Sequence, residues 1–135
     1  MKIRWTGESL RLRITPAELS ALRGGEALTE GLALPGGRWE LRLRPSGDDL
    51  AALWAGGIVI VDVPVREVAR LAEPEREGVY GRTGDLRLMV EKDFPCAHPH
   101  ADEAGEPHTE RFAPTPSYLA RKATTLAALP PAATN

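Results

Sequence analysis

The sequence has little that would mark a secreted, membrane-spanning or nucleic-acid-binding protein. Its one cysteine, Cys96, rules out an internal disulfide and fits a reducing compartment. No apolar run approaches the ~20 residues that cross a bilayer, and the opening MKIRWTGES lacks the apolar core of a signal peptide. The 17 basic and 19 acidic residues leave a net charge of -2, which gives no electrostatic reason to expect nucleic acid. We therefore expect a cytoplasmic protein with neither a membrane nor a nucleic-acid partner.

The short motifs of the commonest enzyme classes are absent as well. The sequence contains no phosphate-binding loop, zincin helix, nucleophile elbow or dinucleotide-binding fingerprint. We therefore expect no cofactor, assign no catalytic residue and favour a protein without enzymatic activity.

A regular apolar pattern covers residues 2–93 and ends near Phe94. The residues that follow hold 7 of the 12 prolines, and the stretch from Phe94 to Glu110 contains no lysine or arginine. Such a segment has little apolar surface to offset the entropy lost on ordering. We expect one α+β domain at 1–93 and a Pro-rich, largely irregular C-terminal tail at 94–135. The one candidate element of that tail is a short helix at 117–129.

Within the domain, alternation of apolar and charged residues predicts β-hairpins. KIRW at 2–5 and LRLRI at 10–14 flank the turn TGES. A second hairpin, from Leu28 to Leu43, turns at Gly36-Gly37, which supplies positive φ angles. The tryptophans fall at apolar strand positions and are predicted to be core residues: Trp5, Trp39 and Trp54.

A short helix is predicted between these hairpins. Thr15 can cap it, Pro16 suits its first turn, and Glu18 completes a capping box. The helix should end at Gly24-Gly25.

The same pattern then recurs along the chain. GIVIVDVPVREVARLAE at 57–73 matches SLRLRITPAELSALRGG at 9–25 at an offset of 48, with the apolar positions of the two predicted helices shifted by one residue. GDLRLMVE at 84–91 matches GRWELRLR at 37–44 at an offset of 47. The sequence therefore predicts two ββαββ repeats, 2–44 and 50–93, the second opening with a hairpin that turns at Gly56-Gly57. A helix at Leu50–Ala55 is the alternative for that opening.

Eight mostly antiparallel strands and two helices define the predicted fold. We expect an α+β domain whose duplicated ββαββ units form one curved antiparallel eight-stranded sheet or barrel. Two short helices should cover one face of that sheet.

The sequence carries two resemblances. Read from its second strand, the element order resembles that of the triphosphate-tunnel (CYTH-like) barrels, whose helices pack outside a polar tunnel. The glutamate-x-glutamate-x-lysine signature of those enzymes is absent, and the nearest stretch is Glu40-Leu41-Arg42-Leu43-Arg44. The segments MKIRWTGESLRLRIT and LRLMVEKDFPC resemble a family of small uncharacterised bacterial proteins, over residues 1–96. That resemblance implies a bacterial protein and no particular activity.

One cluster has the residue types of a metal site. Cys96, His98 and His100 lie close together, with His108 further on and Asp93, Asp102 and Glu103 as additional carboxylates. These side chains suit zinc, iron or copper, but structural zinc sites usually draw two ligand pairs from separate turns. We favour a solvated strand exit with no bound metal over a metal site or a nucleophilic Cys96, since nothing evident would lower the pKa of this thiol.

A second cluster is the set of arginines on the strands of the first repeat. They point away from the leucine face, with Lys2 and Arg38 beside them and Glu40 as the one opposing charge. Arg4 should lie opposite Arg11 and Lys2 opposite Arg13, while Gly31 and Thr29 should lie opposite Arg42 and Arg44. Like charges directly across a hairpin are destabilising. The candidate anion-binding residues are therefore Arg4, Arg11, Arg13, Arg42 and Arg44.

Three interpretations of this arginine face stay open. It is a solvated surface, an ion-pair network closed by Glu40, Glu91 or the acidic stretch 102–110, or a binding site for an anion. Arginine suits phosphate and carboxylate groups because its planar fork donates two hydrogen bonds at once.

Two functions follow from these observations. The favoured one is a non-catalytic module that binds an anionic ligand, such as a phosphate-containing or carboxylate small molecule, or a protein partner. The alternative is a metal-dependent phosphohydrolase of the triphosphate-tunnel type, with Glu40, Glu91 or Asp62 holding the metal. The oligomeric state is not predicted.

Overall fold

The computed structural model of the chain describes residues 1–95 and 111–127. Within these residues the element order β-β-α-β-β occurs twice and is followed by one more helix, which confirms the α+β class. The elements of the first half are β1 (Lys2–Trp5), β2 (Ser9–Ile14), α1 (Pro16–Arg23), β3 (Leu28–Leu34) and β4 (Gly37–Pro45). Those of the second half are β5 (Ala51–Ala55), β6 (Ile58–Val63), α2 (Val65–Leu71), β7 (Gly78–Thr83) and β8 (Leu86–Lys92), with α3 at Pro116–Ala127.

The prediction of a single antiparallel eight-stranded sheet or barrel is wrong. The strands form two four-stranded sheets: sheet A, with the order β1-β2-β8-β7, and sheet B, with the order β3-β4-β6-β5. Both sheets are mixed, because their central pairs, β2–β8 and β4–β6, run parallel. Each half of the chain thus gives one hairpin to each sheet. Apolar periodicity defines strands but not their partners, so the sequence did not reveal this exchange.

The two sheets meet at β5 and β7 without forming a continuous ladder. The backbone N–H of Ala52 on β5 donates to the side chain of Thr83 on β7 (2.9 Å) rather than to a strand carbonyl. The approach is close, because a Cβ built on Gly81 would lie 3.1 Å from the Cβ of Leu50. A side-chain bond at this seam takes the place of the backbone pairing that a closed barrel would need.

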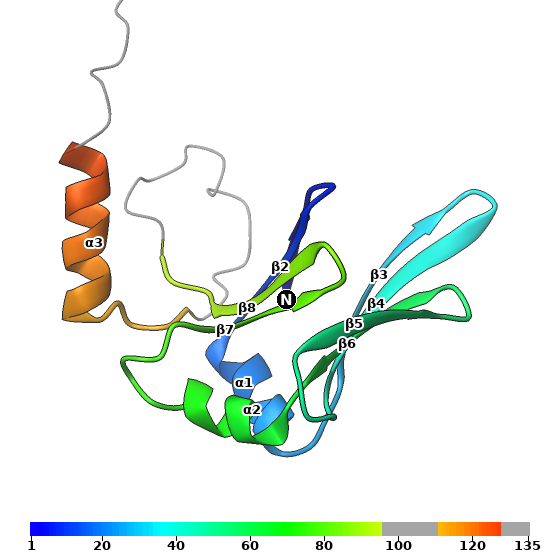
Figure 1. Ribbon diagram of the computed structural model, residues 1–135, viewed down its shortest axis with the longest axis horizontal. Coiled ribbons are helices and arrows are strands. Elements are labelled where there is room, and N and C mark those ends of the chain that lie inside the picture. Colours follow the sequence, from blue (N-terminus) through cyan, green and yellow to red (C-terminus); the bar gives the residue numbers. More distant parts are fainter. Residues whose placement is uncertain (96–110, 128–135) are drawn as a thin grey trace, which may run out of the picture.

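The apolar core lies between the two sheets and the helices α1 and α2 (Figure 1). Figure 1 shows the sheets diverging from the end at which these two helices pack on each other. The helices therefore do not cover one face of a single sheet, as the sequence predicted. Each helix buries two apolar side chains, Leu19 and Leu22 on α1 and Val68 and Leu71 on α2.

The helix start was predicted correctly at α1. Thr15 accepts a hydrogen bond from the backbone N–H of Glu18, and the Glu18 side chain accepts one from the N–H of Thr15. Helix α2 begins after Pro64, which makes no side-chain capping bond. Leu19 matches Val68 in position, which confirms that the two helices are shifted by one residue relative to the offset of 48. The internal repeat itself stays a prediction that the common element order supports.

The second hairpin has a different register from the predicted one. Its turn uses Gly36, with φ of 94°, and Leu34 pairs with Gly37, so Gly37 already belongs to β4. Gly31 consequently lies opposite Glu40 and Thr29 opposite Arg42, two residues away from the expected pairing. In contrast, Gly56 and Gly57 both adopt positive φ and form the predicted turn of the third hairpin, which excludes the alternative helix there.

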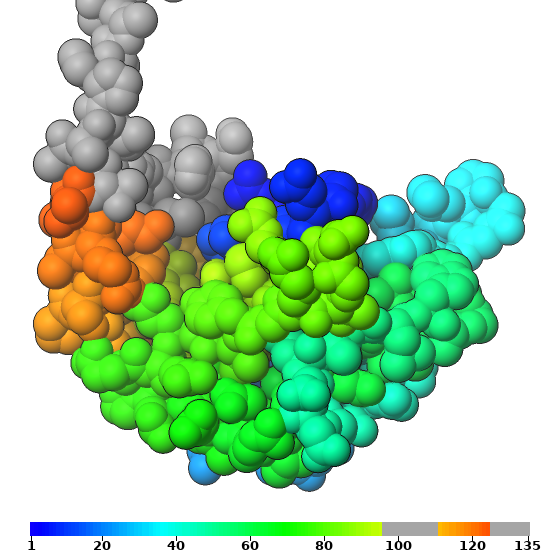
Figure 2. All heavy atoms as spheres, viewed as in Figure 1, coloured from blue at the N-terminus to red at the C-terminus, as the bar shows by residue number. Residues whose placement is uncertain are grey.

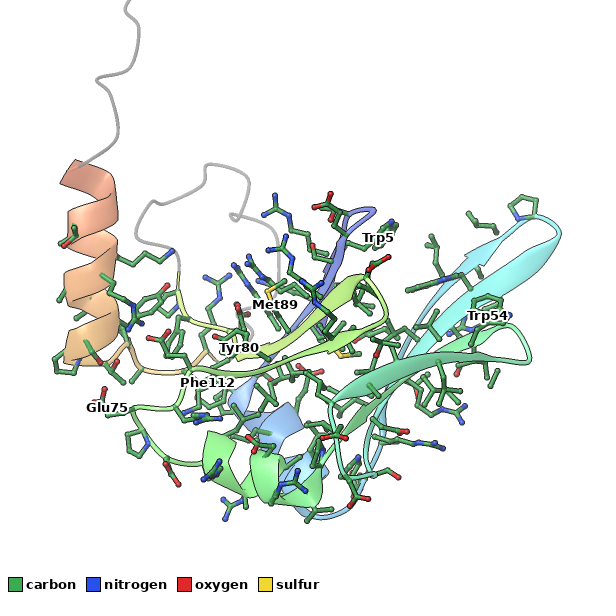
Figure 3. All side chains as sticks on the ribbon, in the orientation of Figure 1. Trp5, Trp54, Glu75, Tyr80, Met89 and Phe112 are labelled. Carbon is green, nitrogen blue, oxygen red and sulfur yellow. The ribbon has the colours of Figure 1, made fainter. Side chains whose placement is uncertain are left out.

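The prediction that the tryptophans are core residues is wrong for Trp5 and Trp54, whereas Trp39 packs against the core. Trp5 and Trp54 are each 67% exposed, and Trp39 is partly buried, with its ring 5.9 Å from that of Trp5. Trp5 and Trp54 lie on the inner faces of the sheets but close to the hairpin tips (Figure 3). Alternation fixes the face on which a side chain lies, and it does not fix whether the opposite sheet still covers that face.

Part of the predicted tail packs against the end of β8. The backbone N–H of Phe112 donates to the carbonyl of Asp93 (3.1 Å), and the Phe94 ring contacts those of Phe112 and Tyr118. Helix α3 lies beside the segment before β7 (Figure 2), where Arg121 forms an ion pair with Glu77. Among the described residues, no helix has both the length and the apolarity required to cross a membrane.

Candidate functional site

The predicted arginine residues do not share one surface. Arg4, Arg11 and Arg13 lie on the outer face of sheet A, whereas Arg42 and Arg44 lie on the outer face of sheet B. The sequence prediction placed the first four strands in one sheet and therefore merged two separate faces.

On sheet B, both candidate arginines are paired with carboxylates. Arg44 donates to the Oδ1 atom of Asp62 (2.5 Å) and its second nitrogen lies 3.4 Å from Oδ2. This hydrogen bond, with the charge of Asp62, raises the pKa of Arg44 above its usual value. Arg42 lies 3.4 Å from a carboxylate oxygen of Glu40. The ion-network interpretation therefore describes sheet B.

On sheet A, the predicted cross-strand pairs of like charge are confirmed. Arg4 lies directly opposite Arg11, and Lys2 directly opposite Arg13. Two carboxylates lie nearby: Glu91 is 3.6 Å from the Nε atom of Arg11, and Asp93 is 3.4 Å from Lys2. These distances are longer than the contact between Arg44 and Asp62 on sheet B. The Nε atom of Arg11 is buried and makes no hydrogen bond with the described part of the chain.

Two more arginines of the second half lie on the same face and were missed by the sequence analysis. Arg82 on β7 lies directly opposite Arg87 on β8, and β8 is the parallel neighbour of β2. The alternation of LRLMVE shows that Arg87 points away from the core, so its orientation could have been read from the sequence. Its proximity to Arg4 and Arg11 could not, because that depends on the pairing of β2 with β8.

We refer to this surface as the cationic face. Within residues 1–95 and 111–127, Arg4, Arg13, Arg82 and Arg87 form no ion pair. The cationic side chains of the face are Lys2, Arg4, Arg11, Arg13, Arg82 and Arg87.

The middle of the cationic face carries Met89 and Tyr80 (Figure 3). A guanidinium nitrogen of Arg11 lies 3.7 Å from the sulfur of Met89. The ring of Tyr80 extends over Gly78, because a Cβ built there would lie only 2.8 Å from the tyrosine oxygen. Burial, and then the charge of Glu91, raises the pKa of Tyr80, so its hydroxyl stays protonated at neutral pH.

The family described as "Family of unknown function (DUF7009)" matches the chain over residues 1–111. The chain belongs to DUF7009. Searches of curated proteins and of solved structures found no match. The DUF7009 match runs beyond the resemblance drawn from the sequence, which ended at residue 96, and it includes all of the cationic face.

The candidate metal ligands Cys96, His98 and His100, together with His108, Asp102 and Glu103, lie outside the described residues. Of the cluster, only Asp93 is described, and its buried carboxylate lies near Lys2 (3.4 Å) and Arg111 (3.9 Å). No group of three potential ligands occurs in the part of this DUF7009 chain that the structure describes.

The carboxylates of the phosphohydrolase alternative are not brought together. Glu40 and Asp62 lie on sheet B next to Arg42 and Arg44, whereas Glu91 lies on sheet A. The space between the sheets is filled by leucine and valine side chains rather than by polar groups.

Proposed function

We propose that this DUF7009 chain is a non-catalytic module that binds an anionic ligand through the cationic face of sheet A. The observation that supports it most is the pair of direct cross-strand contacts between like charges, Arg4 with Arg11 and Arg82 with Arg87. Such pairs are destabilising unless a negative group lies beside them. Glu91 lies 3.6 Å from Arg11, whereas no described carboxylate forms an ion pair with Arg4, Arg82 or Arg87. A bound anion would supply that group.

The residue type suggests the chemistry of the ligand. Four of the five arginines on this face make no ion pair with any described residue, so their guanidinium N–H groups are available to a ligand. They are Arg4, Arg13, Arg82 and Arg87. A guanidinium group donates two parallel hydrogen bonds to a phosphate or a carboxylate. The ligand should therefore carry such an oxyanion.

Thermal unfolding with inorganic pyrophosphate at low salt tests the proposal. A ligand at ~100 times its dissociation constant stabilises the folded state by about 2.7 kcal/mol, which raises Tm by several degrees. The shift should decrease with added salt, since the interaction is electrostatic. It should also decrease in Arg4→Ala and in Arg87→Ala.

Arg38→Ala is the matched control. Arg38 is exposed on the outer face of sheet B, so its loss removes the same charge without touching the cationic face. If pyrophosphate leaves Tm unchanged at low salt, or if Arg38→Ala weakens the shift as much as Arg4→Ala does, the cationic face is not an anion site.

A further inference from the structure

Tyr80 gives the cationic face a feature that a simple anion would not use. Its side chain is 59% exposed although it lies in the middle row of the sheet, in line with Met89 and Arg11. An exposed aromatic ring among arginines is a surface on which another ring can stack.

The orientation of this ring follows from Gly78. Gly78 lies two residues before Tyr80 on the same face of β7, and a Cβ there would lie 2.9 Å from the Cζ atom of Tyr80. The ring therefore lies along the strand, over the position that a side chain would otherwise fill. The side chain is nonetheless more than half exposed, so the ring remains accessible from solvent.

The charges around the ring differ at its two ends. At the hydroxyl end, a Cβ built on Gly78 would lie 2.8 Å from the Tyr80 oxygen and 3.0 Å from the Cγ atom of Glu91. The side chain of Glu91 therefore lies next to the hydroxyl. At the other end, Arg82 is the next residue of β7 on this face, about 7 Å along the strand. Arg87 lies directly opposite Arg82. At the hydroxyl end the positive charges of Arg11 and Arg76 oppose the negative charge of Glu91. The other end carries the two cations alone, so an anionic group is attracted most strongly there.

We propose that the ligand of the cationic face is a phosphate ester that carries an aromatic ring, as nucleoside phosphates do. Its ring stacks on Tyr80, and its phosphate binds between Arg82 and Arg87. This inference rests on the proposed anion-binding function and adds the class of the ligand and its orientation. The protonated hydroxyl of Tyr80 keeps the ring uncharged, so it does not repel the phosphate.

The test compares ADP with inorganic pyrophosphate by titration calorimetry at low salt. Stacking on Tyr80 should make ADP bind at least about tenfold tighter than pyrophosphate, which corresponds to about 1.4 kcal/mol. Tyr80→Ala should remove this difference and leave pyrophosphate binding unchanged, whereas Tyr80→Phe should retain it. Arg87→Ala should weaken both ligands.

Trp54→Ala is the control for the loss of an exposed aromatic side chain, because Trp54 is at least as accessible as Tyr80 but lies on sheet B. It should leave the preference for ADP intact. Equal affinities of ADP and pyrophosphate would overturn the inference and leave the anion site standing, as would an equal loss of both in Tyr80→Ala. If neither ligand binds, the proposed function itself fails.

Discussion

Sheets A and B have the same strand arrangement but a different balance of cations and carboxylates on their outer faces. In each, two parallel central strands are flanked by one antiparallel strand on either side. Arg13 and Glu91 face each other in the central ladder of sheet A. At the equivalent positions of sheet B the charges are exchanged, with Asp62 facing Arg44.

The remaining positions extend this contrast. On the edge strands, Lys2 and Arg4 of sheet A correspond to Ala51 and Leu53 of sheet B. On the central strands, Arg11 of sheet A corresponds to Ile60 of sheet B. Their neighbours in the parallel ladder also differ, with Met89 beside Arg11 and Arg42 beside Ile60. Sheet B also carries arginines on its outer face, but Arg42 and Arg44 there lie beside the carboxylates of Glu40 and Asp62. The strand arrangement therefore does not require an excess of cations over carboxylates. The fold alone does not account for the cationic face, which supports the proposed binding role.

The largest expected effect comes from removing the tail, which packs at the end of sheet A only. A chain that ends at Asp93 should still unfold cooperatively, because the core between the sheets lies within residues 1–93. Loss of the rings of Phe94 and Phe112 should cost about 3 kcal/mol in the free energy of unfolding. Urea unfolding followed by tryptophan fluorescence measures both properties.

In the full chain, Phe112→Ala should reproduce part of this loss. It should also speed hydrogen exchange in β8 rather than in β6, the equivalent strand of sheet B. The absence of any cooperative transition in the chain ending at Asp93 would show that the tail belongs to the folding unit.

The next effect compares two equivalent positions directly. Asp62→Ala leaves Arg44 without the carboxylate to which it is hydrogen bonded, and should lower the free energy of unfolding, although the exposure of Arg44 keeps the loss small. Arg13→Ala removes one of several like charges on sheet A and should be neutral or slightly stabilising. Chemical denaturation of the two variants provides the comparison. Equal losses would mean that the two faces do not differ as described.

A smaller effect is expected when sheet A is given a carboxylate. Arg4→Glu places opposite charges across the β1–β2 hairpin, because position 4 lies opposite Arg11. The variant should be about 0.5–1 kcal/mol more stable at low salt and should lose its response to pyrophosphate. Leu53→Glu, at the equivalent position of sheet B, faces Ile60 and should bring no such gain. A destabilised Arg4→Glu chain would contradict the electrostatic account of the cationic face.

The sequence predicted the local elements well because their signals are local. The capping box needs only Thr15 and Glu18, and the hairpin turn at Gly56-Gly57 needs only two positive φ angles. Sheet partners are a different problem. Strand β2 pairs with β8, which lies at the other end of the domain, and no periodicity within either strand encodes that choice.

The same distinction explains what was found and missed at the site. Arg4 and Arg11 were paired correctly because one hairpin contains both. Arg42 was wrongly grouped with them, and Arg82 and Arg87 were missed, because membership of a face depends on long-range pairing.

The smallest expected effect is a titration that reports how Tyr80 is placed on the cationic face. In a Tyr118→Phe chain Tyr80 is the one tyrosine left, and its absorbance should change at a pH above its ordinary value of about 10. Burial is the main cause and Glu91 the second, so Glu91→Gln should lower the midpoint without restoring the ordinary value.

The same shift has a consequence for stability. The folded chain keeps the proton of Tyr80 at a pH where the unfolded chain has lost it. The contribution of Tyr80 to stability is therefore full below a pH of about 10 and is lost as the pH rises through the folded pKa. Comparing the pH dependence of stability with that of the Tyr80→Phe chain separates the contribution of Tyr80 from that of Lys92, since burial lowers the pKa of Lys92. An unchanged midpoint in Glu91→Gln would mean that this carboxylate does not adjoin the hydroxyl. The orientation of the phosphate would then rest on the attraction of Arg82 and Arg87 alone.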